Sequence, residues 1–239
     1  MSIALVLFSG GLDSSACLYW ALERYEKTIL LGFTYGSKED EVIQKSNQRF
    51  SKMYNLESKI IKLDFLEELS LKRGSKLASS ETEPPEFSNF NQLNEKELTI
   101  ETAKQVWVPG RNILFLSAAS SVADSYKEPI DILFGANKEE GATFPDNTPE
   151  FVERMNEAIN LGCLNRVTVL APFNVQMKTE IIKFLIEKEA KFEYISSCYQ
   201  VRNWTREGYP VHCGICESCQ RKKRAFQESG FKDLTFYQK

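Results

Sequence analysis

The first residues able to do chemistry form the run Ser9-Gly10-Gly11-Leu12-Asp13-Ser14-Ser15, which follows a continuous apolar stretch from Ile3 to Phe8. Such a stretch predicts a buried strand, and the glycines predict a tight turn into a helix that begins near Asp13. Glycines let the backbone approach an anion closely, while hydroxyls and the N–H groups of a helix start donate to it. The run therefore predicts a phosphate-binding loop; a glycine turn with a serine or aspartate cap is the structural alternative.

Two common nucleotide-binding patterns do not fit this loop. No lysine follows the glycines as it would in a Walker A motif. No third glycine stands at the spacing of the Rossmann dinucleotide fingerprint either. The loop is thus expected to bind phosphate in another way.

Four of the six cysteines lie in the last third of the chain at metal-ligand spacing. Cys198 is followed after fourteen residues by Cys213, Cys216 and Cys219, which form two Cys-x-x-Cys steps. Four thiolates can close a tetrahedron around zinc without an open coordination position, so we predict a structural zinc site. Free or redox-active thiols are the alternative, and His212, the only histidine, is expected to be a neighbour of the site.

Three further motifs place polar groups at the expected ends of elements. Val108-Pro109-Gly110-Arg111-Asn112 puts an arginine at a helix start, where its planar fork could grip a phosphate or carboxylate. Gly135-Ala136-Asn137 ends a strand at the edge where doubly wound folds bind ligands, and Phe144-Pro145-Asp146 and Pro149-Glu150-Phe151 follow it. Lys178 follows Ala171-Pro172-Phe173 and could neutralise phosphate charge in a transition state. Taken alone, these motifs have plainer interpretations as a surface cap, turns and an exposed lysine.

The elements that must position these groups alternate between strand and helix. Further strands are predicted over residues 28–34, 59–63, 130–135 and 168–170, and helices over 39–54, 112–125 and 175–187. This alternation favours an α/β fold with a Rossmann-like parallel sheet and helices on both faces. We expect an ATP-binding domain over residues 1–190 and a small zinc-binding appendage over residues 191–239.

The stretch from Lys72 to Leu98 changes character, with Ser79 and Ser80 ahead of two prolines and an asparagine-rich patch. Loops of this length are uncommon unless they are functional or disordered. It is expected to be a long mobile loop, either a lid over the sheet edge or a disordered insert.

Composition limits the classes of function. The 239 residues, 42% of them hydrophobic, can bury one substantial core. A net charge of −3 provides no overall basic field, so no stable nucleic-acid partner is expected. The N-terminus lacks a basic leader and a cleavage site, and no apolar run reaches membrane-spanning length, so we expect a soluble, cytoplasmic protein without membrane contact.

Taken in order, SGGLDSS, VPGRN, GAN with FPD and PEF, APF with K-x-E, and the terminal cysteines resemble the 7-cyano-7-deazaguanine synthase (QueC) family. The resemblance spans nearly the whole chain and implies a PP-loop (HUP-type) sheet, ATP, magnesium, structural zinc and a homodimer. It implies an AMP-forming C–N ligase: ATP adenylates 7-carboxy-7-deazaguanine, ammonia gives the amide, and a second adenylation drives dehydration to the nitrile, a queuosine and archaeosine precursor.

The same resemblance implies roles for individual residues. Those implied as catalytic are Ser9, Asp13, Ser14, Arg111 and Lys178. Those implied to bind ATP are Phe8, Ser9, Gly10, Gly11, Leu12, Asp13, Ser14, Ser15, Thr34, Gly110, Arg111 and Gly135. Those implied to face the deazapurine are Asn137, Phe144, Pro145 and Asp146. Asp146 would accept from ring N–H groups, with a turn-capping role as the alternative, and the four cysteines would hold the metal.

The chain departs from the family's usual pattern in two places near the implied pocket. Tyr35-Gly36-Ser37-Lys38-Glu39 stands where Tyr-Gly-Gln-Arg-His is common, and Asn147-Thr148 replaces Cys-Arg. The span between the first two cysteines of the cluster is also longer than usual. Because the ATP loop is intact, the residues support adenylation more directly than nitrile formation.

Three other functions remain as alternatives. A QueC-like enzyme of antiviral gene clusters would adenylate the same acid and transfer it to an amine of a protein, docked on the enlarged cysteine loop or the 72–98 segment. A PP-loop enzyme that thiolates or amidates tRNA would need a basic patch, for which Arg221-Lys222-Lys223-Arg224 is the candidate; we interpret this run as a solvated helix face. A non-enzymatic zinc module that binds nucleic acid would leave the Ser-Gly-Gly loop without a role.

Overall fold

The computed structural model describes residues 2–78 and 81–238. Its centre is a five-stranded sheet in the order β3-β2-β1-β4-β5, in which every neighbouring pair is parallel. The strands are β1 (Ile3–Leu7), β2 (Lys27–Thr34), β3 (Glu57–Lys62), β4 (Ile130–Leu133) and β5 (Val167–Leu170). The predicted α/β fold with a parallel sheet is confirmed.

Burial along the strands explains their sequence patterns. Every residue of β1 is buried, as expected for a central parallel strand covered on both faces. The outermost strand β3 instead begins with exposed Glu57, Ser58 and Lys59, because an edge strand meets solvent on one side.

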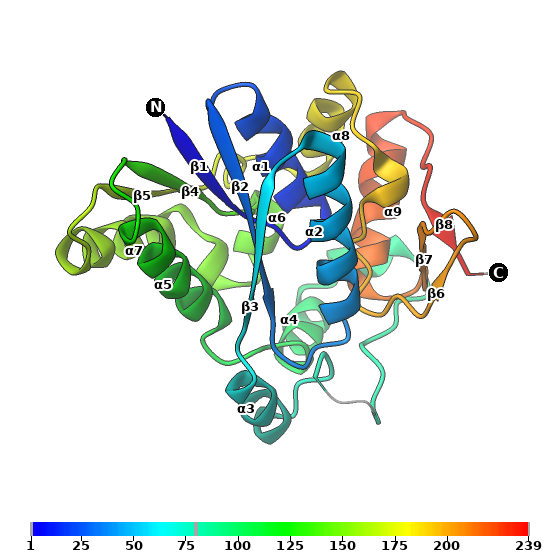
Figure 1. The fold of residues 1–239 in the computed structure, drawn as a ribbon. Helices are drawn as coiled ribbons and strands as arrows, with labels where there is room; N and C mark the ends of the chain where they lie inside the picture. Colours follow the sequence, from blue (N-terminus) through cyan, green and yellow to red (C-terminus); the bar gives the residue numbers. More distant parts are fainter. Residues whose placement is uncertain (1, 79–80, 239) are drawn as a thin grey trace.

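Helices cover both faces of the sheet (Figure 1). Helices α1 (Leu12–Leu22), α2 (Asp40–Tyr54) and α8 (Lys178–Glu187) contribute to one core, and α5 (Arg111–Asp124) and α7 (Pro149–Gly162) to the other. Alternate residues of β1 divide between these cores: Ala4 and Val6 join the first, and Ile3, Leu5 and Leu7 join the second. Each core therefore forms between one sheet face and its own helices.

The C-terminal region carries a second, smaller sheet and one helix. Strands β6 (Asn203–Trp204), β7 (Pro210–His212) and β8 (Phe236–Tyr237) lie in that order, and α9 (Glu217–Ser229) packs beside α8 (Figure 1). Phe226 of α9 belongs to the first core, and its ring centroid lies 5.3 Å from that of Phe192. The region thus shares the core of the main sheet.

The segment between β3 and α5 is more ordered than predicted. Helix α3 (Phe65–Arg73) runs into its start, and η1 (Phe90–Asn94) and α4 (Lys96–Gln105) occupy its end. The asparagine-rich patch is a capping motif, because the Asn89 side chain accepts from the N–H of Asn91 at 2.9 Å. The prediction of a structureless loop was therefore wrong over 90–98; Ser79 and Ser80 lie outside the described residues.

The middle of that segment is held against the cysteine region. Glu86 forms a β-bridge with Cys216, and the N–H of Phe87 donates to the Ile215 carbonyl at 2.8 Å. These contacts explain why a run rich in turn-forming residues holds its place.

The Pro149-Glu150-Phe151 motif is likewise not a turn but the first turn of α7. Thr148 caps it by accepting from the N–H of Phe151 at 3.2 Å, and Pro149 occupies the first helical position, where a missing N–H costs nothing. Across the ranges that the structure describes, no helix combines the length and apolar character needed to cross a bilayer.

Candidate functional site

A cavity lies where the strand order reverses. The chain leaves β1 toward β2 and β3 on one side and returns to β4 and β5 on the other, so the carboxyl ends of β1 and β4 form the crevice where doubly wound folds bind ligands. Eleven of the predicted site residues line this cavity: Phe8, Ser9, Gly11, Leu12, Asp13, Ser14, Arg111, Gly135, Phe144, Asp146 and Lys178. The remaining predicted residues, Gly10, Ser15, Thr34, Gly110, Asn137 and Pro145, stand outside its lining.

The loop after β1 is shaped so that hydroxyls surround a helix start. Gly10 has a φ of +80°, and a Cβ there would lie 2.4 Å from the Cβ of Ser46, so only glycine fits. The N–H of Gly11 donates to Ser9 Oγ at 3.3 Å, and Ser9 Oγ lies 3.1 Å from Ser14 Oγ. This arrangement of hydroxyls at the N-terminus of α1 suits a phosphate.

Gly135, which follows β4, lets that strand reach the same helix start. A Cβ at this position would stand 2.9 Å from the backbone nitrogen of Ser14 and 3.0 Å from the carbonyl carbon of Asp13. Both atoms belong to backbone, which cannot turn aside as a flexible side chain can. Gly135 thus allows the end of β4 to pack closely against the N-terminus of α1.

Lys178 is buried inside the cavity wall and not exposed. Its side chain is 2% exposed, its Nζ pairs with Glu140, and Asp13 Oδ2 lies 3.4 Å away. Burial lowers the pKa of Lys178, but the negative charges of Asp13 and Glu140 outweigh burial and hold the pKa above its ordinary value. The lysine therefore stays cationic beside the loop after β1.

The two carboxyl groups around Lys178 differ in proton affinity. Burial raises the pKa of Asp13 to about 6, against the opposing charge of Lys178. Burial also acts on Glu140, but the charge and hydrogen bond of Lys178 prevail and lower the pKa of Glu140 to about 2. Carboxylate oxygens are the ligands that Mg²⁺ prefers, so Asp13 and Glu140 are the residues here that could hold one. Glu140 was not among the predicted residues, although it follows the Gly-Ala-Asn motif closely.

Arg111 opens α5 and forms a second polar cluster across the cavity. Its Nη1 donates to Tyr35 Oη at 3.4 Å, and it also acts on the carboxyl groups of Glu39 and Asp146. Burial raises the pKa of Glu39 to about 7 and raises that of Asp146, and in both cases Arg111 opposes the rise. Glu39 and Tyr35 line the cavity, yet sequence reasoning noted them only as part of an unusual segment.

The predicted substrate residues divide into two groups. Phe144 and Asp146 line the cavity. Asn137 is wholly buried and instead caps α6 (Lys138–Gly141), because its Oδ1 accepts from the N–H of Glu140 at 3.0 Å. Trp107, which was not predicted, also lines the cavity; its ring lies parallel to that of Phe144 within 11°, at a centroid distance of 6.2 Å. Trp107 directly precedes the Val-Pro-Gly-Arg-Asn motif, and this position could have indicated that it lies near the site.

The segment before Cys198 completes the wall of the cavity. The N–H of Leu12 donates to Ser197 Oγ at 3.3 Å, and the N–H of Ser196 donates to the Gly10 carbonyl at 2.8 Å. Tyr199 and Ser218 line the cavity as well. The cysteine region therefore supports the loop after β1 directly.

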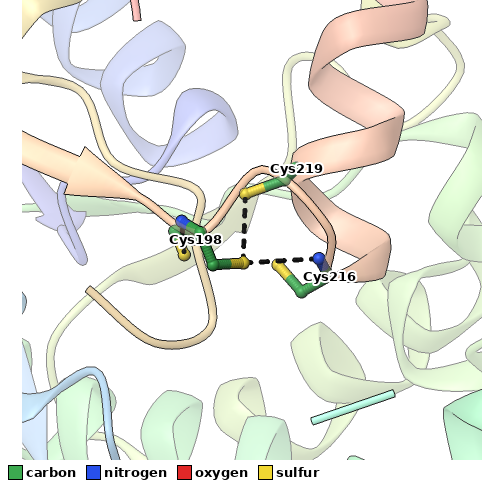
Figure 2. Close-up of side chains that lie close together, drawn as sticks. Cys198, Cys216 and Cys219 are labelled. Carbon is green, nitrogen blue, oxygen red and sulfur yellow. Dashed lines mark hydrogen bonds between the residues drawn. The ribbon is translucent and has the colours of Figure 1, made fainter. Parts of the chain in front are cut away.

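The four predicted cysteines converge into one buried cluster, of which Figure 2 labels Cys198, Cys216 and Cys219. Their sulfur atoms all lie within 4.8 Å of one another, and Cys213 Sγ is 3.9 Å from Cys219 Sγ. Zinc–sulfur bonds of about 2.3 Å in a tetrahedron place sulfurs about 3.8 Å apart, so the spacing fits a four-thiolate metal site. The N–H groups of Cys213 and Gln200 donate to Cys198 Sγ at 3.3 and 3.4 Å, as expected for thiolates. His212 is buried outside this group, with its ring edge-on to Tyr237.

The basic run of α9 is interior, so its interpretation as a solvated face was wrong. Arg221 and Lys222 are 6% and 0% exposed, and Lys222 Nζ donates to the Ile195 carbonyl at 3.2 Å. Arg221 pairs with Glu217 at 2.7 Å, and Arg224 pairs with Glu139 at 2.6 Å. The remaining member, Lys223, donates to the Gly214 carbonyl at 2.8 Å. The run is used within the protein and offers no basic patch to RNA.

Glu139 connects this helix to Lys178. It accepts from the backbone N–H of Lys178 at 3.1 Å, and Arg224 and Arg221 lie 2.6 and 3.5 Å from its Oε2. The start of α8 is thereby fixed to α9.

The chain as a whole matches a known family. A family model described as "Queuosine biosynthesis protein QueC" matches residues 3–230. The chain is 46% identical over 234 residues to the 7-cyano-7-deazaguanine synthase of Pyrococcus furiosus, which covers 98% of this chain and 96% of that protein. It is 40% identical over 240 residues to the 7-cyano-7-deazaguanine synthase of Methanococcus maripaludis (strain C7), covering 98% of each. The matched residues include the loop after β1, the cavity and all four cysteines.

Proposed function

Because the chain belongs to the QueC family, we propose that it converts 7-carboxy-7-deazaguanine to 7-cyano-7-deazaguanine with ATP and ammonia. The observation that carries this proposal is the meeting, in one cavity, of the Ser-Gly-Gly loop with Arg111 and Lys178. A phosphate site and two cations around it suit a reaction that moves negative charge from substrate to pyrophosphate.

A carboxylate needs activation because its oxygen is a poor leaving group. In the proposed first step the acid attacks the α-phosphorus of ATP, the bond between the α-phosphorus and the bridging oxygen breaks, and pyrophosphate leaves. Ammonia then displaces AMP to give the amide. A second adenylation, on the amide oxygen, lets AMP leave again as the nitrile forms.

Three groups that line the cavity support the adenylation steps of this proposal. The hydroxyls of Ser9 and Ser14 and the N–H groups of the helix start would hold the pyrophosphate. Lys178, cationic and buried, would stabilise the negative charge that develops as pyrophosphate leaves. Arg111, on the opposite wall, would orient the substrate's anionic groups.

Two metals accompany this proposal. Mg²⁺ would neutralise phosphate charge when bound, and Asp13 and Glu140 offer the oxygens to hold it. Zinc would fill the cluster of four cysteines and fix the segment of Ser196 and Ser197 against the loop after β1. We further propose that the protein acts in the cytoplasm as a homodimer, with residues 1–190 as the ATP-binding domain and 191–239 as the zinc-bound appendage.

The test is to incubate the zinc-loaded protein with ATP, Mg²⁺, 7-carboxy-7-deazaguanine and ammonium, and to follow AMP and the mass of the deazaguanine. Nitrile with about two AMP per product is expected, since two oxygens in turn must become leaving groups. Lys178→Met is expected to lower the rate of AMP release by about 100-fold or more, the usual effect of losing such charge stabilisation.

The same reaction distinguishes the alternatives. AMP release without amide or nitrile, together with a partner protein that gains the mass of the acyl group, would establish conjugation to a protein amine. Absence of AMP release that depends on the deazaguanine would contradict the proposal. The tRNA-modifying alternative has lost its basic segment, because Arg221 to Arg224 are engaged within the protein.

A further inference from the structure

Glu39 has a carboxylate that faces the cavity and has no partner of its own. Its backbone N–H donates to Ser37 Oγ, but its side chain forms no hydrogen bond or ion pair within residues 2–78 and 81–238. The other carboxyl groups of the cavity are all engaged: Asp13 and Glu140 with Lys178, and Asp146 with Asn147 Nδ2 at 3.2 Å. A partly buried carboxylate without donors is costly unless a ligand supplies them.

Flat aromatic rings line the same cavity as this carboxylate. Trp107 and Phe144 lie parallel within 11°, and Phe33 and Phe115 stack at a centroid distance of 4.3 Å and an angle of 9°. All four rings line the cavity. Such surfaces suit a planar heterocycle, since stacking of a base on an aromatic side chain contributes about 1–3 kcal/mol.

The hydrogen-bonding pattern decides which heterocycle fits. A guanine-type ring carries two adjacent donors, the N1–H and the 2-amino group, and the two oxygens of one carboxylate can accept both. Its neighbouring carbonyl oxygen accepts from an arginine, as in the recognition of guanine by arginine in DNA, and Arg111 interacts electrostatically with Glu39. Adenine presents an acceptor at N1, which an ionised carboxylate repels, so the ionised form of Glu39 does not fit the base of ATP.

We propose that Glu39 recognises the N1–H and 2-amino edge of the deazaguanine and determines its specificity for a guanine-type base. This inference rests on the proposed function and moves the role of acceptor from Asp146, whose carboxylate already has a donor, to Glu39. Glu39 belongs to the segment that departs from the family's usual pattern.

The experiment compares two substrates in wild type and in Glu39→Ala. The substrates are 7-carboxy-7-deazaguanine and the analogue with hydrogen in place of its 2-amino group, and the readouts are kcat/KM for each base and KM for ATP. A good bidentate contact is worth about 1–3 kcal/mol of discrimination, or roughly 5- to 150-fold. Wild type should prefer the amino substrate by a factor in that range. Glu39→Ala should lose a similar factor with the amino substrate and should no longer distinguish the two, with KM for ATP unchanged within about twofold.

Two further variants separate recognition from folding. Glu39→Gln keeps the shape of the side chain but offers a single acceptor oxygen, so its melting temperature should be no lower than that of wild type while most of the preference is lost. Asp146→Asn, the matched change at the other carboxyl group, should keep the preference for the amino substrate.

The outcomes are distinct. A preference that survives in Glu39→Ala, or disappears in Asp146→Asn, would overturn the assignment, and a rise in KM for ATP alone would place Glu39 at the adenine. If wild type does not turn the acid over, the proposed function fails separately, and calorimetric titration of the two bases then tests Glu39 through Kd. Equal affinity of wild type for both bases, or no binding of either, would refute the inference.

Discussion

Replacing Gly135 by alanine tests whether the close approach of β4 to α1 shapes the phosphate site. The new Cβ would stand 2.9 Å from Ser14 N, 3.0 Å from the Asp13 carbonyl carbon and 3.2 Å from Ser14 Cα. Ordinary contact needs about 3.5 Å, so the helix start must move by about 0.5 Å. Overpacking of this kind costs about 1–3 kcal/mol. A displacement of about 1 Å can cost 100-fold in rate, so a loss of roughly tenfold in kcat/KM for ATP is expected.

Urea unfolding measures the loss of stability, and AMP release measures the loss of kcat/KM for ATP. The matched control is Gly162→Ala at the end of α7, where an added Cβ meets nothing within 4 Å. That variant should keep the wild-type rate of AMP release, and its free energy of unfolding should change by less than about 1 kcal/mol. Wild-type kcat/KM for ATP in Gly135→Ala would show that the reasoning about the helix start is wrong.

Three other predictions concern the metal, the interior charges and pH. Cys216→Ser should lose bound zinc by elemental analysis and most AMP release, because the cluster fixes the segment that supports the loop after β1; a variant that keeps one zinc per chain and full activity would refute this. Arg221→Gln should lower the free energy of unfolding by about 3–5 kcal/mol, since Glu217 would keep a buried, uncompensated charge, whereas Arg206→Gln at an exposed position should change it by less than about 0.5 kcal/mol; equal effects would place Arg221 at the surface. Burial raises the pKa of Glu39 from 4.5 to about 7, so the free energy of unfolding falls as the pH rises from 4.5 to 7 and stays lowered above pH 7. Glu39→Gln should therefore be more stable than wild type at pH 8 and equally stable at pH 4. A difference in urea unfolding that does not change with pH would contradict this.

Local sequence patterns were sufficient to predict the parallel sheet and the sites whose residues lie close together in sequence. The fully apolar run of β1 and the glycines after it predicted both the central strand and the loop at its end. Cys213, Cys216 and Cys219 lie within one turn and helix start, so spacing alone predicted their convergence, with Cys198 as the fourth. These features depend on neighbours a few residues away.

The errors arose where distant residues decide the outcome. Arg221 and Lys222 have the composition of a solvated helix, but their partners Glu139 and Ile195 come from other parts of the chain. Glu39 was noted only as a departure from a pattern, because its place in the cavity depends on α5 and on the walls behind it. No periodicity within one helix carries that information.

The packing of α9 also limits how the protein can be made. Phe226 of α9 belongs to the same core as Val6 and Phe8 near the N-terminus. During synthesis on a ribosome, the first strand leaves the exit tunnel long before the helix that completes its surroundings. Because domains generally fold as units, this core is expected to close only after α9 has emerged. Until then the apolar face of the central strand is open to chaperones.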